Sequence, residues 1–208
     1  MDLLQLTADM AHLASILILI HRIHIRKTCA GISLKTHILY LTVFITRYGD
    51  LFLYTHSIYN ITMKILYLIT SSYIVFLMTL SPHYKLTWYR GLDTFTITPI
   101  LVLSAVLAII ITHRYTVFEV LWTCSIILES MAILPQLFHL TQVPSLPALP
   151  LSHLVALGVY RFFYVLHWMH ASFNHTRKVD FTSFLFGLLQ TLIWADFLWV
   201  WYNRKVIK

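Results

Sequence analysis

The chain has 208 residues, of which 59% are hydrophobic and only 11% are charged, and its mean hydropathy is +0.75. Soluble domains of this length are far less apolar, so the composition excludes an ordinary soluble fold and indicates an integral membrane protein. The net charge of +7 does not indicate nucleic-acid binding, because the basic residues lie mainly in loops between apolar runs, where membrane topology accounts for them.

Apolar runs separated by turn signals predict the spanning helices. A hydrocarbon core about 30 Å thick requires about 20 apolar residues per helix, so the chain has room for about seven spans and no soluble domain. The segment Val143–Pro150 contains repeated prolines and cannot continue either neighbouring helix. We therefore expect a single all-α membrane domain over residues 1–208. Its predicted spans are 3–20, 37–54, 58–80, 96–112, 116–134, 150–169 and 181–201.

The loop charges predict the orientation of this domain. Seven spans place the two termini on opposite sides of the membrane. The side of the C-terminus then carries Arg22, Arg26, Lys27, Lys35, Lys85, Arg90, Arg204, Lys205 and Lys208. The other side carries only Lys64, Arg114, Arg177 and Lys178. Because lysine and arginine are enriched in cytosolic loops, we expect the C-terminus in the cytosol and the N-terminus on the lumenal side.

Ionisable residues interrupt the apolar runs and predict a polar interior. A charge at mid-membrane costs about 3 kcal/mol or more unless it is paired or faces water. The residues concerned are Arg47, Asp50, Glu119, Glu129, Arg161 and Asp196.

Helical spacing groups many of the polar and aromatic side chains onto shared faces. The faces consist of Gln5, Asp9 and His12, of Glu119, Trp122 and Glu129, and of Tyr160, Tyr164 and Trp168. Arginine, carboxylates, tyrosines and a histidine gathered in one interior suit a small polar ligand that carries both charge signs. Among the histidines, His12 is the candidate for a pH switch, since it lies within an apolar helix.

Purely structural roles remain open for the same residues. Arg47 with Asp50, and Arg161 with Glu129, could be neutralising pairs that hold a helical bundle together. Cys29 and Cys124 lie far apart and indicate neither a disulfide framework nor a metal site. No combination of nucleophile, base and oxyanion donors indicates an enzyme, and no motif indicates a cofactor.

Several ordered segments resemble the KDEL receptor family. They match it in order and spacing along essentially the full length of the chain. The segments are Cys29–Ser33, Arg47–Phe52, Tyr59–Asn60, Glu119–Thr123, Leu128–Ser130, Ala132–Phe138 and Ala156–Arg161.

The resemblance implies a fold and a function. The fold would be a seven-helix arrangement related to SWEET sugar transporters, with two three-helix bundles linked by the fourth helix. The function would be retrieval: binding of the C-terminal KDEL-like or HDEL-like tetrapeptide of escaped ER lumenal proteins in the acidic Golgi, and release in the ER. A basic tail at Asn203–Lys208 would recruit the COPI coat, although a simple cytosolic anchor explains the tail equally well.

The resemblance also implies roles for matched residues. Arg47 would bind the terminal carboxylate of the signal, and Asp50 with Glu119 would favour its basic first residue. The residues expected to line the cavity are Trp122, Tyr160, Tyr164 and Trp168. The residues expected to sense pH are His12, Glu129 and Tyr160.

Two positions depart from the family pattern. Gln5 and Ala171 stand where family members usually carry arginines that bind the acidic residues of the signal. Recognition of two acidic side chains is therefore in doubt, whereas capture of a terminal carboxylate is not. Two rival functions stay open: a SWEET-like small-solute or proton-coupled transporter, since a fold alone does not define an activity, and a receptor paralogue with altered or lost signal binding.

Overall fold

The structure, a computed structural model, describes residues 3–52, 57–112, 115–143, 149–173 and 181–206. Within these ranges the chain forms helices and connecting loops, without a β-strand. The longer helices are α1 (Leu3–Arg26), α2 (Leu34–Arg47), α3 (Ile58–Thr79), α5 (Thr98–Ile111), α6 (Val117–Met131), α7 (Leu134–Gln142), α8 (Leu151–Phe173) and α9 (Phe181–Val206). The short helices are η1 (Gly49–Phe52), α4 (Pro82–Lys85) and η2 (Arg90–Leu92).

Several of these helices are long and apolar enough to cross a membrane. Four segments of the described chain meet this condition by length and composition: Leu3–Arg26, Ile58–Thr79, Val117–Gln142 and Thr182–Val200. The shorter α5 is also apolar. Many leucine, isoleucine and valine side chains lie exposed along the helices, as expected for surfaces that face lipid. The expected all-helical membrane fold is confirmed at this level.

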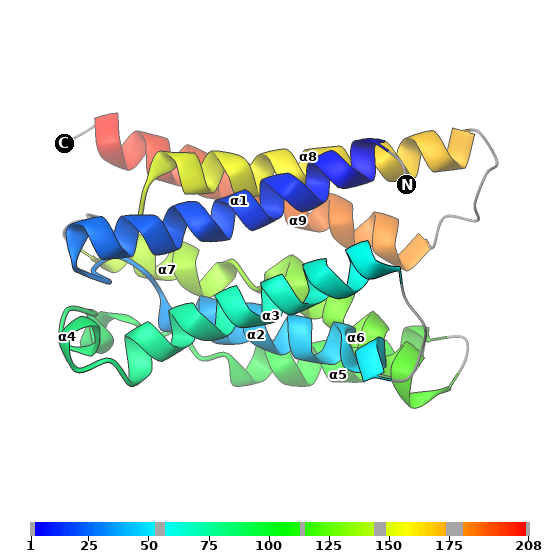
Figure 1. The fold of residues 1–208 in the computed structure, drawn as a ribbon, viewed down its shortest axis with the longest axis horizontal. Helices are drawn as coiled ribbons and strands as arrows, with labels where there is room; N and C mark the ends of the chain where they lie inside the picture. Colours follow the sequence, from blue (N-terminus) through cyan, green and yellow to red (C-terminus); the bar gives the residue numbers. More distant parts are fainter. Residues whose placement is uncertain (1–2, 53–56, 113–114, 144–148, 174–180, 207–208) are drawn as a thin grey trace.

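The helices run along a common direction, and the first and last described residues lie at opposite ends of the molecule (Figure 1). α1 packs along α8, while α2 lies between α3 and α6. α9 contacts both α6 and α8, and α5 packs against α6. Residues of α1, α2, α3, α6, α8 and α9 all line the interior.

Two helices differ from the spans expected from hydropathy. α2 ends at Arg47, well before residue 54, and η1 follows it directly. The fifth predicted span, 116–134, corresponds to α6, which ends at Met131, and a further helix, α7, continues beyond the predicted end. Pro135 explains the break between the two helices, because it has no N–H to donate to the carbonyl of Met131, four residues earlier. Hydropathy records how apolar a run is, but it does not register such interruptions of the backbone.

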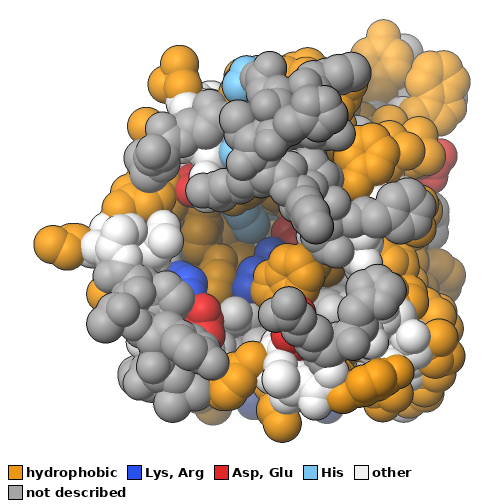
Figure 2. Space-filling model, turned by 90° about the vertical axis from the view of Figure 1, so that its right-hand side faces the viewer, with side chains coloured by type: hydrophobic (Ala, Val, Ile, Leu, Met, Phe, Trp, Pro, Cys, Tyr) orange, Lys and Arg blue, Asp and Glu red, His pale blue; other side chains and the backbone are white. Residues whose placement is uncertain are grey.

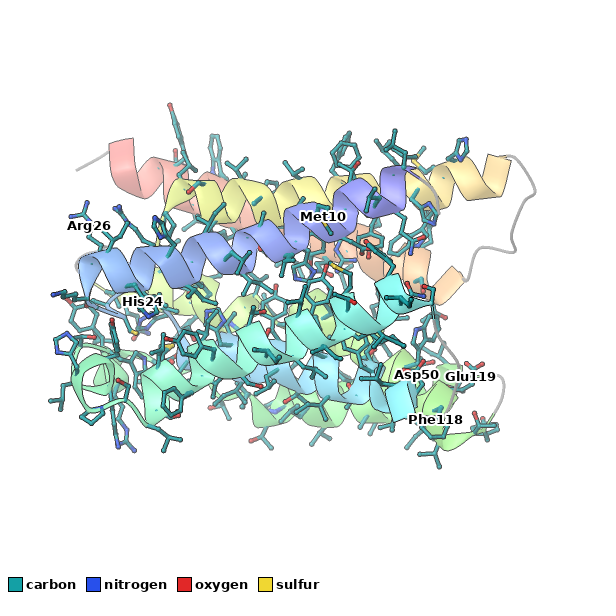
Figure 3. The ribbon with its side chains drawn as sticks, in the orientation of Figure 1. Met10, His24, Arg26, Asp50, Phe118 and Glu119 are labelled. Carbon is teal, nitrogen blue, oxygen red and sulfur yellow. The ribbon has the colours of Figure 1, made fainter. Side chains whose placement is uncertain are left out.

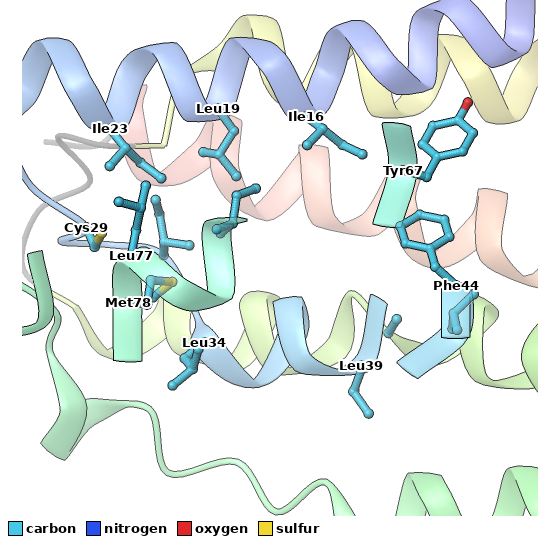
Figure 4. Packing of buried hydrophobic residues seen from close by; sticks show 14 of the residues in the cluster. Ile16, Leu19, Ile23, Cys29, Leu34, Leu39, Phe44, Tyr67, Leu77 and Met78 are labelled. Atoms are coloured by element: carbon cyan, nitrogen blue, oxygen red, sulfur yellow. The ribbon is translucent and has the colours of Figure 1, made fainter. Parts of the chain in front are cut away.

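One side of the bundle is held by an apolar core between α1, α2 and α3 (Figure 4). Leu19 and Ile23 of α1 face Ile74 and Met78 of α3, and all four side chains are buried. Removing a side chain of this size from a packed core costs about 2–5 kcal/mol, so this cluster fixes how the three helices meet.

The loop before α2 is fixed by buried polar contacts. The carboxylate of Asp93 accepts hydrogen bonds from the Ser33 hydroxyl and the Leu34 amide, each at 2.9 Å. The Gln136 side chain accepts from the Ser33 amide at 2.7 Å and donates to the Gly31 carbonyl at 2.9 Å. These bonds stabilise the first turn of α2, whose amides lack partners within the helix. Burial raises the pKa of the nearby Cys29 thiol to about 12, so this cysteine is unreactive at neutral pH.

Gly158 allows α8 and α9 to approach closely. A Cβ atom at this position would lie 2.0 Å from the ring of Trp194 on α9. We predict that Gly158→Ala lowers the stability of the purified protein by about 1–3 kcal/mol, because the ring must move within a packed interface. Thermal unfolding in detergent measures the effect. Gly91→Ala is the matched control, since nothing lies within 4 Å of its Cβ position; equal stability of the two variants would contradict the prediction.

Candidate ligand-binding site

A buried carboxylate lies between two guanidinium groups at the centre of the bundle. Glu129 of α6 contacts Arg47 of α2 at 2.7 Å through one oxygen and Arg161 of α8 at 2.9 Å through the other. The side chain of Glu129 is 6% exposed. A carboxylate so deeply buried is stable only when it is paired and hydrogen-bonded, so these contacts tie three helices to one point.

Hydrogen bonds extend this cluster to α9. The Tyr160 hydroxyl donates to Glu129 at 3.2 Å and accepts from the Gln190 amide at 3.0 Å. Arg161 donates to the side-chain carbonyl oxygen of Gln190. His12 of α1 stacks on the Tyr160 ring, with 4.1 Å between centroids and 8° between planes. The imidazole thus lies against the network that holds the Glu129 carboxylate.

A cavity of about 500 Å³ opens beside the cluster. Figure 2 views the molecule from the end where α1 begins, and it shows a hollow with basic and acidic side chains inside. A volume of this size falls within the range of small-ligand pockets. The polar and aromatic residues that line it are Gln5, His12, Phe44, Arg47, Tyr48, Tyr67, Trp122, Glu129, Arg161, Tyr164, Trp168, Ser183 and Gln190.

A second cavity of about 440 Å³ adjoins the first and is more acidic. Arg47 and Trp122 line both cavities, so they form the boundary between them. Asp50 and Glu119 line only the second one, and both lie at the end of the molecule where α2 ends and α6 begins (Figure 3). The two cavities therefore meet at a guanidinium that is paired with Glu129 in the first cavity and lies near two further carboxylates in the second.

Exposure distinguishes the two arginines of the cluster. The side chain of Arg47 is 21% exposed, whereas that of Arg161 is 7% exposed. Glu129 contacts only one nitrogen of the Arg47 guanidinium, and the Nε of Arg47 donates to the Ser125 hydroxyl at 3.1 Å. Arg47 is thus the guanidinium that a ligand in the cavity can reach, while Arg161 holds the network behind it.

Asp9 joins α1 to two other helices near the mouth of the larger cavity. Its carboxylate accepts hydrogen bonds from Tyr59 of α3, at 2.8 Å, and from Tyr164 of α8. The Tyr67 hydroxyl donates to the Asp9 backbone carbonyl, also at 2.8 Å. Tyr164, which lines the cavity, is therefore held in place by a carboxylate.

The residues singled out in the sequence occupy different places. The cavities bring together Gln5, His12, Arg47, Asp50, Glu119, Trp122, Glu129, Tyr164 and Trp168. Tyr160 lines neither of these two cavities; it is 2% exposed and lies behind their wall, against His12 and Glu129. Ala171 belongs to the last turn of α8, but its side chain is outside the described residues, as are Arg114, Arg177, Lys178 and Lys208.

The suggested Arg47–Asp50 pairing was wrong. Arg47 pairs with Glu129, and Asp50 pairs with Lys64 of α3 at 2.8 Å. The reason is local: the α-helix ends at Arg47, so the three-residue spacing no longer places Asp50 on the same helical face. The suggested pairing of Arg161 with Glu129 is confirmed.

Sequence analysis missed two members of the network. Gln190 contacts Arg161 and Tyr160 from α9, and Ser125 contacts Arg47 from α6. Gln190 could have been found from the sequence, since an amide within an apolar helix requires buried partners. Ser125 could not have been found in this way, because a serine in such a helix can donate to a backbone carbonyl of the same helix. Ser125 does so with the Trp122 carbonyl.

Apolar helices suited to crossing a membrane, arranged around a charged cavity, define the class: a helical membrane protein with a polar site in its interior. The family model described as ER lumen protein retaining receptor matches residues 28–171, and the chain belongs to this family.

Curated relatives agree along nearly their whole length. The ER lumen protein-retaining receptor of Petunia hybrida is 40% identical over 98% of this chain and 94% of its own. The receptor of Saccharomyces cerevisiae is 38% identical over 99% and 96%, and that of Drosophila melanogaster is 40% identical over 100% and 96%.

The buried position of Glu129 leads to a prediction about stability. In Glu129→Ala, two buried guanidinium groups would face each other without a counter-charge, which costs about 3–5 kcal/mol. We expect Glu129→Gln, which keeps the shape and removes the charge, to lose nearly as much. The midpoint of thermal unfolding in detergent measures both variants. Lys64→Gln, at a more exposed ion pair, is the control and should lose less; a Glu129→Gln protein as stable as the unaltered one would contradict this role.

Proposed function

We propose that the chain is a retrieval receptor that binds the C-terminal tetrapeptide of escaped ER lumenal proteins in the Golgi and releases it in the ER. Membership of the ER lumen protein retaining receptor family supports this function. The observation that carries it is the partly exposed guanidinium of Arg47, at the boundary between two cavities, the second of which contains the carboxylates of Asp50 and Glu119. We place the protein in ER and Golgi membranes.

A seven-span topology fits the helices of the structure. In it, α1, α2, α3, α5, α6 with α7, α8 and α9 each cross once. Contacts of α3 with α1 and α2, and of α9 with α6 and α8, support two three-helix bundles linked by α5, as in SWEET transporters. The cavity end, where α1 begins, would face the lumen, and the basic end would face the cytosol.

The C-terminal tetrapeptide would bind with its terminal carboxylate on Arg47. A guanidinium can hold a carboxylate by two parallel charge-assisted hydrogen bonds, and a partly desolvated site strengthens them. Asp50 and Glu119, in the adjoining cavity, would attract the basic first residue of the signal. Trp122, Tyr164 and Trp168 would contact the residues between the two ends.

Protonation of His12 would couple this binding to pH. The charged or titratable groups that act electrostatically on the His12 ring are Glu129, Arg47, Arg161 and His153. A proton on His12 adds positive charge next to the cavity that receives the carboxylate, so peptide and proton favour each other's binding. Affinity would therefore rise as pH falls, which gives capture in the Golgi and release in the ER.

The residue at position 5 bears on which retrieval signals the site would prefer. Gln5 lines the cavity as a neutral amide, so this part of the site offers an acidic signal residue less compensation than an arginine would. We propose that this receptor prefers signals with fewer acidic residues than the signals preferred by family members that carry arginine at this position and at position 171.

The COPI coat would be recruited by the tail Asn203–Lys208.

Arg47 provides the most direct mutational test of binding. We predict that Arg47→Ala weakens binding of a C-terminal signal peptide by about 2–5 kcal/mol, because the carboxylate loses its charged partner in a desolvated site. Calorimetry with purified protein measures the loss. A peptide with an amidated C-terminus is the control: the mutation should cost it little. Unchanged affinity for the free acid in a correctly folded variant would contradict the role of Arg47.

His12 provides the test of the pH response. We predict that His12→Ala flattens the dependence of peptide affinity on pH between about 5.5 and 7.5, the range around an ordinary histidine pKa of about 6.5. His83→Ala is the matched control, since His83 is exposed on α4 and bonds to the Lys27 carbonyl. An unaltered pH profile in His12→Ala would place the sensor elsewhere.

A further inference from the structure

A small inner chamber lies on the far side of His12 from the ligand cavity. Its volume is about 30 Å³, and it is enclosed by α1, α2, α3, α7 and α8. The His12 ring lines both this chamber and the ligand cavity, so it forms part of the wall between them. The polar residues that line the chamber are His12, Ser15, Thr36, His37, Tyr40, Ser71, Gln136 and His153.

The chamber has the size that ordered water requires, and polar groups on one part of its otherwise apolar wall could bond to that water. One water molecule needs about 10–15 Å³ of such volume and two to four polar partners, whereas empty cavities are generally apolar. The Thr36 hydroxyl lines the chamber, is 2% exposed as a residue, and has no hydrogen-bond partner among the described residues. A buried hydroxyl without a partner costs about 1–3 kcal/mol, and a water molecule in the chamber would remove that cost.

Two further histidines meet in this chamber. His153 of α8 is buried, and its Nδ1 lies 2.8 Å from the Ser15 carbonyl oxygen of α1. Since a carbonyl oxygen only accepts, Nδ1 carries the hydrogen, and Nε2 is the atom of a neutral His153 that can accept a proton. His37 of α2 lines the same chamber, so the two imidazoles border one small volume.

We propose that the inner chamber binds water and that His37 and His153 form, with this water, a second proton-binding site behind the ligand cavity. Water and the Thr36 hydroxyl would solvate the charged imidazole that a dry interior would not tolerate. The two histidines repel each other when both are charged, so they share one proton between them.

Among the described residues that line the chamber, none is acidic. The Tyr40 hydroxyl and the amide of Gln136 face the chamber from α2 and α7, and neither is an ion at neutral pH. On the far side of His12, the Glu129 carboxylate lies between Arg47 and Arg161. This cluster carries one net positive charge, so the chamber water and the Thr36 hydroxyl, rather than a neighbouring carboxylate, would stabilise a proton in the chamber.

This site goes beyond the proposed function, because it binds a proton with or without a peptide. Where the proposed function also holds, and the chamber binds its proton more tightly in the peptide-bound state, two protons rather than one favour that state. The affinity for peptide would then change by more than tenfold per pH unit, which one proton cannot produce.

Proton uptake by the peptide-free protein tests the site. The purified protein in weakly buffered detergent is brought from pH 7.5 to 5.5, and the bound protons are counted by titration. A histidine with an ordinary pKa of about 6.5 takes up about 0.8 proton over this interval. We expect His37→Gln with His153→Gln to lower the uptake by about 0.8 proton, whereas each single variant lowers it less. His83→Gln, at an exposed histidine outside the chamber, is the matched control for the substitution itself.

Side-chain nitrogen NMR of the histidines in the unaltered protein gives an independent result that needs no double variant. The spectrum of a protonated imidazole differs from that of a neutral one, and the single variants assign the signals. We expect His37 or His153 to become protonated between pH 7.5 and 5.5. Unchanged proton uptake in the double variant, or both rings neutral at pH 5.5, would overturn the proposal. A failure of peptide binding would contradict the proposed function but would leave these counts unaffected.

Discussion

The contact of one buried carboxylate with two arginines is the interaction on which the interior of this protein depends. Glu129 brings α2 and α8 to α6, and Tyr160 with Gln190 adds α9. None of these groups would be stable alone in an apolar bundle, so their positions are mutually required. The larger cavity lies beside these polar side chains, and an apolar cluster rich in leucine and isoleucine packs α1, α2 and α3 together.

The same contact separates structural charge from charge that is accessible to a ligand. Arg161 is almost fully enclosed, whereas Arg47 faces the cavity with about a fifth of its surface. An anion that reaches Arg47 competes with Glu129 for this guanidinium. Binding would therefore be transmitted to α6 and, through Tyr160, to His12 on α1. A change in the charge of His12 would act along the same path in the opposite direction, which is the reciprocity that linkage requires.

The sequence was sufficient for the class of fold and for most members of the site, since charges in apolar runs have few physical explanations. It was insufficient for the partners of these charges. Asp50 pairs with Lys64 because a helix ends after Arg47, and the break between α6 and α7 follows from Pro135. Tyr160 was expected in the cavity wall but lies behind it, because a helical stripe does not reveal which of its members faces the opening. Pairings of this kind depend on the packing of helices that are distant in sequence.

The most direct measurement is the affinity of the unaltered protein for a signal tetrapeptide and for the same peptide with an amidated C-terminus, each at pH 5.5 and 7.5. If Arg47 receives the carboxylate and protonation favours binding, the free acid binds more tightly at pH 5.5 than at 7.5. The amide then binds weakly at both pH values. Equal affinity for the two peptides, or an affinity for the free acid that is the same at both pH values, would contradict the central claim.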